Sequence, residues 1–123
     1  MTPADELRAA AKLLREDAHR AQIASPLPWL TTDEHVIRCG NEDIVADRSS
    51  NPSEAGDLPY IAAMHPGVGD KISGLLEAAA GFVDDYPDLT RPHIDDEPCS
   101  DHACHIVHAS LAVARAINTG SQP

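Results

Sequence analysis

Residues 57–76 read Asp57-Leu-Pro-Tyr-Ile-Ala-Ala-Met-His-Pro-Gly-Val-Gly-Asp-Lys-Ile-Ser-Gly-Leu-Leu76, and two predicted helices meet within them. Asp57 is a natural N-cap, and Pro59 suits the first helical turn because no N–H donor is needed there. Pro66 disfavours helical geometry at His65, so we expect His65 to be a cap or corner residue. A second helix then begins at Pro66. Its apolar residues recur at three- and four-residue spacing: Val68, Ile72, Leu75, Leu76, Ala79 and Val83.

A further helix is predicted over residues 3–22, before this corner. Thr2 suits its N-cap and Pro3 its first helical position, with acidic residues following in the first turn. The small and apolar residues of this segment share one side at helical spacing: Leu7, Ala10, Ala11, Leu14, Ala18 and Ala21. We expect that side to pack within the molecule.

The last predicted helix covers residues 100–118. Ser100 or Asp101 caps its N-terminus, and Gly120 marks its end. One side is again apolar at helical spacing, and we expect that side to join the core: Ala103, Ile106, Val107, Ser110, Val113, Ala114 and Ile117.

A small sheet is predicted between the first helix and the proline corner. Three short runs favour strands, at residues 29–32, 35–39 and 43–46. Gly40-Asn41 is a tight-turn signal between the last two runs. The sequence therefore predicts a three-stranded antiparallel meander that needs cover from helices.

Together these elements predict a single α+β domain over residues 1–123, with a three-stranded antiparallel sheet and about four helices. Aromatic residues are few, so the core should rely on Leu, Ile, Val and many Ala. Residues 47–56 should form an exposed polar loop. The expected parts are the N-terminal helix 3–22, the β-hairpin region 29–46, the helical pair 57–85, the acidic loop 86–99 and the C-terminal helix 100–118.

The charge is strongly acidic: twenty Asp and Glu residues against nine Lys and Arg residues give a net charge of −11. Scattered basic residues argue against direct nucleic-acid binding, which needs clustered cations. A partner with a basic surface is favoured electrostatically, although the charge can also serve solubility alone.

The chain contains no apolar run long enough for a membrane span, and its N-terminus does not resemble a signal peptide. We therefore expect a cytoplasmic protein without membrane contact. Three cysteines fit a reducing compartment and argue against a disulfide framework. An Ala-rich helix with a limited apolar stripe leaves surface that a homodimer could bury, so the oligomeric state is open.

The region from Trp29 to Leu76 resembles small phage and prophage proteins that are common in actinobacteria and their phages. The similarity lies in Trp29, a hairpin ending Asp43-Ile-Val-Ala, a polar loop, and Asp57-Leu-Pro-Tyr-Ile-Ala-Ala-Met-His-Pro-Gly-Val. The region is also distantly similar to the ead/ea accessory-region proteins of lambdoid phages. This chain departs from the family at Leu58-Pro59, where Ala-Ala or Ala-Arg is common. The resemblance implies an accessory role in a host cell and a helix-plus-hairpin fold, and it implies no reaction.

One cluster could bind a metal: Cys99-Ser-Asp-His-Ala-Cys-His-Ile-Val-His108. On a helix, Cys104 and His108 lie one turn apart and share a face. Cys99 could fold back toward them, and His93 could complete a tetrahedral zinc site. The alternative fourth ligand is Cys39 at the hairpin turn, and His102 and His105 are further alternates.

Other interpretations of this cluster stay open. The histidines could form a solvated helical face, and Cys104 could be a small buried residue. A disulfide between Cys99 and Cys104 would need an oxidising environment. The sequence contains no recognised active-site motif, and we predict no catalytic or cofactor-binding residue.

Two functional hypotheses follow. The first is a non-enzymatic phage or prophage accessory protein that binds a host or defence protein through its acidic surface, with nucleic-acid mimicry as one form of that binding. The alternative is a small zinc-binding regulator or metal-dependent enzyme that uses the cluster from Cys99 to His108.

Overall fold

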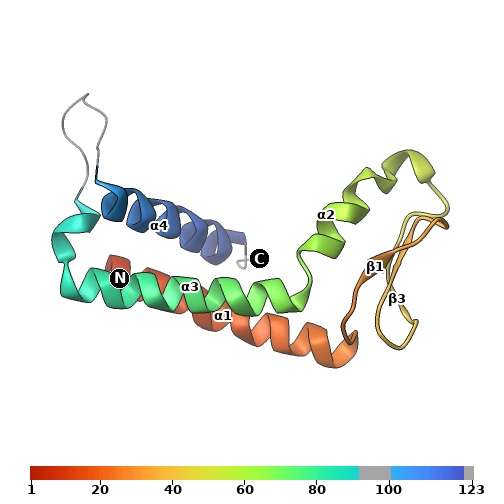
Figure 1. The fold of residues 1–123 in the computed structure, drawn as a ribbon, viewed down its shortest axis with the longest axis horizontal. Helices are drawn as coiled ribbons and strands as arrows, with labels where there is room; N and C mark the ends of the chain where they lie inside the picture. Colours follow the sequence, from red (N-terminus) through yellow and green to blue (C-terminus); the bar gives the residue numbers. More distant parts are fainter. Residues whose placement is uncertain (92–100, 121–123) are drawn as a thin grey trace. The chain divides into compact units, whose positions relative to one another are not determined.

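A computed structural model describes residues 1–91 and 101–120. Within these ranges the chain forms four α-helices, two 3-10 helices and one three-stranded antiparallel sheet, in the order α1, β1–β3, η1, α2, α3, η2, α4 (Figure 1). This confirms the expected α+β fold. None of the described helices is both long enough and apolar enough to cross a membrane.

The chain divides into two compact units. One comprises Met1–Leu14 and Ile72–Pro123, and we call it the helical unit; the other is Arg15–Lys71, the hairpin unit. Helices α1 (Pro3–Ala24) and α3 (Pro66–Asp85) contribute residues to both. The prediction of a single domain stays a prediction.

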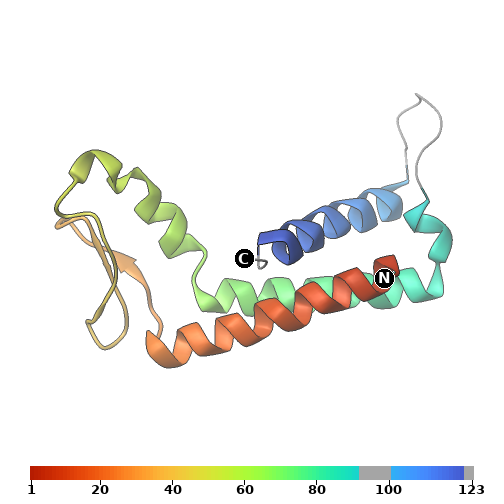
Figure 2. The ribbon, with the colours of Figure 1, turned by 180° about the vertical axis from the view of Figure 1, so that it is seen from behind.

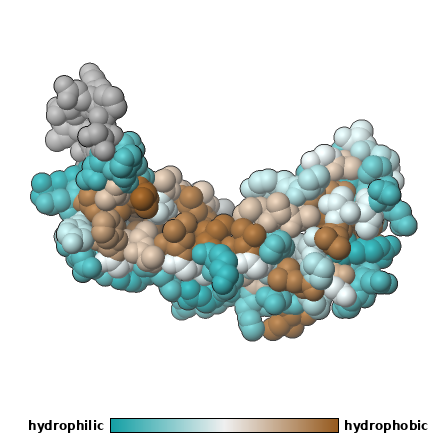
Figure 3. Space-filling view, viewed as in Figure 1, coloured by the Kyte–Doolittle hydropathy of each residue, from teal (hydrophilic) through white to brown (hydrophobic). Residues whose placement is uncertain are grey.

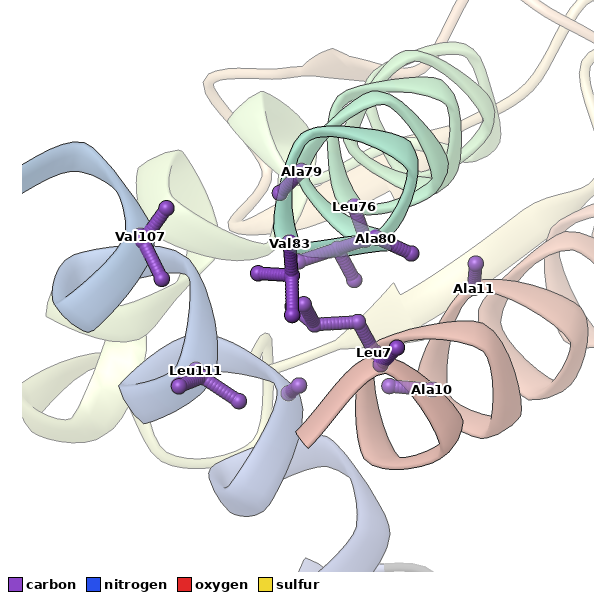
Figure 4. Packing of buried hydrophobic residues seen from close by; sticks show 11 residues of the cluster. Leu7, Ala10, Ala11, Leu76, Ala79, Ala80, Val83, Val107 and Leu111 are labelled. Atoms are coloured by element: carbon purple, nitrogen blue, oxygen red, sulfur yellow. The ribbon is translucent and has the colours of Figure 1, made fainter. Parts of the chain in front are cut away.

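The helical unit contains the first half of α1, most of α3, η2 (Pro87–Thr90) and α4 (His102–Gly120). Figure 2 shows the beginning of α1 running antiparallel to the end of α3. The buried cluster draws on all three α-helices and is rich in alanine, which lets their axes approach closely: Ala4, Leu7, Ala10, Ala11, Leu76, Ala79, Ala80, Val83, Val107, Leu111 and Ala114. In Figure 4, Leu7, Val83 and Leu111 point into the space between the helices.

Polar contacts fix the helix ends and cross between helices in this unit. The Asp5 N–H donates to Thr2 Oγ1 at 3.1 Å, and the Thr2 N–H donates back to the Asp5 carboxylate at 3.2 Å. Thr2 therefore caps α1 as predicted. Asp101 caps α4, because the Ala103 N–H donates to its carboxylate at 3.0 Å. An ion pair of 3.0 Å between Arg115 of α4 and Glu6 joins α4 to α1.

The hairpin unit contains the sheet, with strands in the order β1 (Leu30–Thr31), β2 (Val36–Arg38) and β3 (Ile44–Asp47). Leu30 pairs with Arg38 on one side of β2, and Arg38 pairs with Ile44 on the other. Helix α2 (Leu58–Ala63) packs on β1 and β2, so that Leu58 and Ile37 are both fully buried. The predicted meander and its helical cover are therefore both present.

The turn between β2 and β3 differs in detail from the expectation. The Glu42 N–H donates to the Cys39 carbonyl at 2.9 Å, and Glu42 adopts a left-handed φ of 71°. Gly40 does not have a positive φ. It is required for space instead, because a Cβ at this position would lie 2.3 Å from the Leu27 carbonyl oxygen. The Gly40 N–H also donates to the Pro26 carbonyl at 2.6 Å, so the proline segment braces the turn.

The proline corner forms as predicted, but Asp57 does not cap α2 with its side chain. Part of the expected loop 47–56 is helical: Pro52–Asp57 forms the 3-10 helix η1, which runs directly into α2. Asp57 is therefore in the right-handed helical region, whereas a capping side chain needs extended backbone. Its carboxylate instead binds Arg48 at 2.7 Å.

His65 does cap the next helix. Its Nδ1 atom accepts the Gly67 N–H at 3.1 Å, and its carbonyl accepts the Val68 N–H at 3.0 Å. The imidazole is thus occupied at the start of α3, which agrees with the predicted cap or corner role.

Candidate functional site

The predicted metal ligands on α4 differ in their exposure. Cys104 is buried, and the Nε2 atom of His108, one turn later, is also buried. His102 and His105 are exposed on the same helix. The Cys104 Sγ atom lies 4.0 Å from the Leu89 carbonyl oxygen, so the thiol faces η2. The structure therefore brings Cys104 and His108 together on the inner side of α4.

Among the described residues, no third predicted ligand joins this pair. Cys99 and His93 lie outside the described residues. Cys39 belongs to the hairpin unit, where its thiol donates to the Asn41 side-chain oxygen at 2.8 Å. Across residues 1–91 and 101–120, no group of three or more His, Cys, Asp or Glu side chains is arranged to hold a metal ion. The zinc site stays a prediction.

The acidic surface has a clear pattern of ion pairs. Six arginines each contact a carboxylate: Arg8 with Asp84, Arg20 with Asp17, Arg38 with Glu34, Arg48 with Asp57, Arg91 with Asp88 and Arg115 with Glu6. The hydrogen bond from Arg48 lowers the pKa of the Asp57 carboxyl, and the one to Asp84 raises the pKa of Arg8. These six arginines are therefore partly neutralised by neighbouring carboxylates, and the surplus carboxylates give the surface its net negative charge.

Within the hairpin unit, exposed carboxylates gather at both ends of the sheet. Asp33 and Glu34 lie in the turn between β1 and β2, while Glu42 and Asp43 lie in the turn between β2 and β3. Arg38 is the only cation in residues 30–47. Its guanidinium binds the Glu42 carbonyl at 2.9 Å and lies 3.7 Å from the Glu34 carboxylate. Arg48 follows β3 beside the first turn, and its guanidinium pairs with Asp57, so the two turns together present four exposed carboxylates.

A second surface feature lies in the helical unit. Leu75, Ala78, Ala79 and Phe82 of α3 and Ala103 and Ile106 of α4 line a shallow groove of about 360 Å³. The Leu75 and Ile106 side chains are 58% and 57% exposed, and Phe82 is 38% exposed. Apolar surface over α3 and α4 is visible in Figure 3. We call this feature the α3/α4 groove.

The sequence predicted that Ile106 and Val113 join the core, and this was wrong, because both side chains are exposed. Helix α4 turns Val107, Leu111 and Ala114 toward the other helices, which leaves Ile106 and Val113 at the edge of its stripe. On α3, Leu76 is buried while the adjacent Leu75 is exposed. The apolar side of α3 and the apolar side of α4 are each wider than the surface that the neighbouring helices cover. That excess width is the sequence signal that could have identified the groove.

Comparisons of this chain with protein-family models, with curated proteins and with solved structures found no match. The resemblance to small phage proteins therefore stays a prediction.

Proposed function

We propose that this chain is a non-enzymatic protein that binds another protein through its acidic surface. Following the sequence resemblance, we further propose a phage or prophage accessory role in the cytoplasm of a host cell, with a host or defence protein as the partner. The partner presents a basic surface. Where that basic surface normally binds nucleic acid, the acidic surface competes with the nucleic acid by mimicking its charge.

The observation that carries this proposal is the placement of carboxylates on the two turns of the three-stranded sheet. Asp33 and Glu34 at one end and Glu42 and Asp43 at the other are exposed, and the three strands hold the two turns at a fixed spacing. Like charges held in a fixed arrangement attract a partner whose positive charges have the matching arrangement. The ion pair from Arg38 to Glu34 offsets only part of this charge.

The test is capture of partners from a bacterial lysate by the immobilised chain, at low and at high salt. We expect a partner that is retained at low salt and released at high salt. The variant Asp33→Asn, Glu34→Gln, Glu42→Gln, Asp43→Asn should lose it.

A control variant, Glu16→Gln with Asp17→Asn, removes carboxylates from α1 and should keep the partner. The proposal fails if no salt-sensitive partner is captured, or if the hairpin variant retains the partner as well as the unaltered chain does.

The alternative function, a zinc-binding regulator or metal-dependent enzyme, is supported by one observation. Cys104 and the Nε2 atom of His108 are buried one turn apart on α4, and a thiolate and an imidazole in that relation can both bind one zinc ion. Cys99 and His93 are the proposed additional ligands. This site would be structural in the regulator and would supply a Lewis acid in the enzyme.

Elemental mass spectrometry of protein purified without an affinity metal tests this alternative, together with thermal melting before and after chelation. Near-stoichiometric zinc, a lower melting temperature after chelation and loss of zinc in Cys104→Ala would support it. His19→Ala, an exposed histidine outside the cluster, is the control and should keep the metal. A metal-free protein whose melting is unaffected by chelator would rule the site out.

A further inference from the structure

We infer that the α3/α4 groove docks an amphipathic helix of the partner protein, with its apolar side in the groove and cationic residues flanking that side. This inference rests on the proposed protein-binding function and assigns to it a second contact surface. It commits to one occupant, a cationic amphipathic helix.

The shape of the groove suits a helix. Its walls are two α-helices, and its lining includes Ala78, Ala79 and Ala103, whose small side chains let a third helix approach closely. Leu75, Phe82 and Ile106 rise from it as larger exposed apolar groups. A helix that lays apolar residues at three- and four-residue spacing into such a groove is a common mode of peptide recognition.

The apolar surface continues beyond the groove to Tyr86, which directly follows the end of α3. The Tyr86 ring packs against Phe82, with ring centroids 5.1 Å apart, and Tyr86 is itself exposed. Aromatic side chains of this kind are enriched among the residues that dominate binding energy. The surface therefore extends along α3 over more than two turns, long enough for a helical segment.

Charge identifies the occupant. The helical unit contains ten acidic and four basic residues in its sequence. Asp85 is exposed on α3, three residues after Phe82 and therefore on the same side of the helix. Three of the four cations, Arg8, Arg91 and Arg115, are each held by a carboxylate. A cationic helix gains attraction at this surface, whereas a second copy of a chain with a net charge of −11 meets repulsion.

The experiment measures binding of labelled synthetic peptides of about 18 residues, a length that allows helix formation on binding. The first peptide has leucines on one helical side and lysines on the other. The second keeps the lysines and replaces the leucines by serine and glutamine. The third keeps the leucines and replaces the lysines by glutamate. Fluorescence anisotropy is recorded with the full chain, and we expect the first peptide to bind at least about tenfold more tightly than the others.

Two variants and a control identify the site. Leu75→Glu and Ile106→Glu should each weaken binding of the first peptide by about tenfold or more. Both changes add negative charge, so binding driven by charge alone would be strengthened by them. Ile23→Glu alters a 70% exposed residue outside the groove and should leave binding of the first peptide unweakened. Circular dichroism checks that each variant is folded.

The other outcomes separate this inference from the proposed function. Equal binding of the first two peptides, unaffected by Leu75→Glu, overturns the groove assignment but leaves binding through the acidic surface standing. Binding of no peptide, while lysate capture still depends on the hairpin carboxylates, overturns the groove assignment alone. A chain that sediments as a dimer and becomes monomeric in Leu75→Glu would show that a second copy occupies the groove, which also overturns the inference.

Discussion

In the helical unit a continuous cluster of buried apolar residues joins three α-helices, whereas the hairpin unit buries a smaller set around its sheet, chiefly Val36, Ile37, Cys39 and Leu58. The hairpin unit depends more on specific polar and backbone contacts. The Trp29 indole N–H donates to the Ser25 carbonyl at 2.8 Å, for example. Because burial of apolar area is the dominant stabilising term, we expect the helical unit to resist unfolding more strongly than the hairpin unit.

The largest expected effect comes from removing core volume in the helical unit. Leu76 is 1% exposed, and Leu76→Ala should lower the free energy of unfolding by about 3 kcal/mol through lost burial and the cavity that remains. The adjacent Leu75 is exposed, so Leu75→Ala should cost less than about 0.5 kcal/mol. Urea denaturation followed by circular dichroism measures both. Similar losses in the two variants would contradict the orientation of α3.

The next largest loss of stability is expected in the hairpin unit, where the backbone at Gly40 lies close to the backbone at Leu27. Gly40→Ala would place a Cβ 2.3 Å from the Leu27 carbonyl oxygen, and backbone atoms cannot swing aside as a side chain can. We expect a loss of about 1 to 3 kcal/mol. Hydrogen exchange should show faster exchange at the Ile37 and Cys39 amides.

The control for Gly40→Ala is Gly56→Ala, in the same unit, where an added Cβ has open space. It should leave hydrogen exchange at the Ile37 and Cys39 amides unchanged. If Gly40→Ala accelerates exchange equally at Leu76 and Leu111, the two units unfold together, and the proposed difference in their stability is wrong.

Much of the fold follows from local signals in the sequence. Thr2 and Asp101 act as the caps that were predicted, and Pro66 begins α3. Each of these effects depends on residues within one turn of each other, so sequence reasoning can reach them. The orientation of α4 about its axis does not follow locally, because it depends on which neighbour covers which part of a wide apolar stripe. Ile106 and Val113 were expected in the core and are exposed for that reason.

The candidate sites divide in the same way. The proximity of Cys104 and His108 follows from helix geometry alone, but a third ligand must come from another segment, which periodicity cannot place. The acidic character was readable from composition. The predicted meander already places Asp33, Glu34 and Glu42 in the two turns. Asp43 was expected to begin the third strand, but β3 begins at Ile44, so Asp43 joins the turn.

A smaller, stabilising effect should come from glycine in α3. An added Cβ at Gly81 meets nothing within 4 Å, and Gly81 lies inside the helix. Gly81→Ala should therefore raise the free energy of unfolding by about 0.5 to 1 kcal/mol, because alanine restricts the unfolded chain and favours helix. Urea denaturation measures the gain, and Gly74→Ala should reproduce it. A loss instead of a gain would show that the surroundings of α3 are more crowded than the structure indicates.

The smallest effect concerns the ion pair of the hairpin unit. Hydrogen bonding from Arg48 lowers the pKa of the Asp57 carboxyl, so any stability from this pair is present at neutral pH and is lost as the pH falls through the lowered pKa. Carboxyl carbon NMR should give Asp57 a midpoint below the ordinary range for aspartate. In Arg48→Gln the midpoint should rise toward that range, because the donor and its charge are gone.

Asp5 supplies the matched control in the helical unit. Its pKa is lowered by hydrogen bonds with Thr2 and not by Arg48, so its midpoint should stay low in Arg48→Gln. If the Asp57 midpoint also stayed low in that variant, the carboxylate would be stabilised by something other than Arg48. The loop from Arg48 to Asp57 would then not be closed by this pair, and the hairpin unit would depend still more heavily on its small apolar core and the braced turn at Gly40.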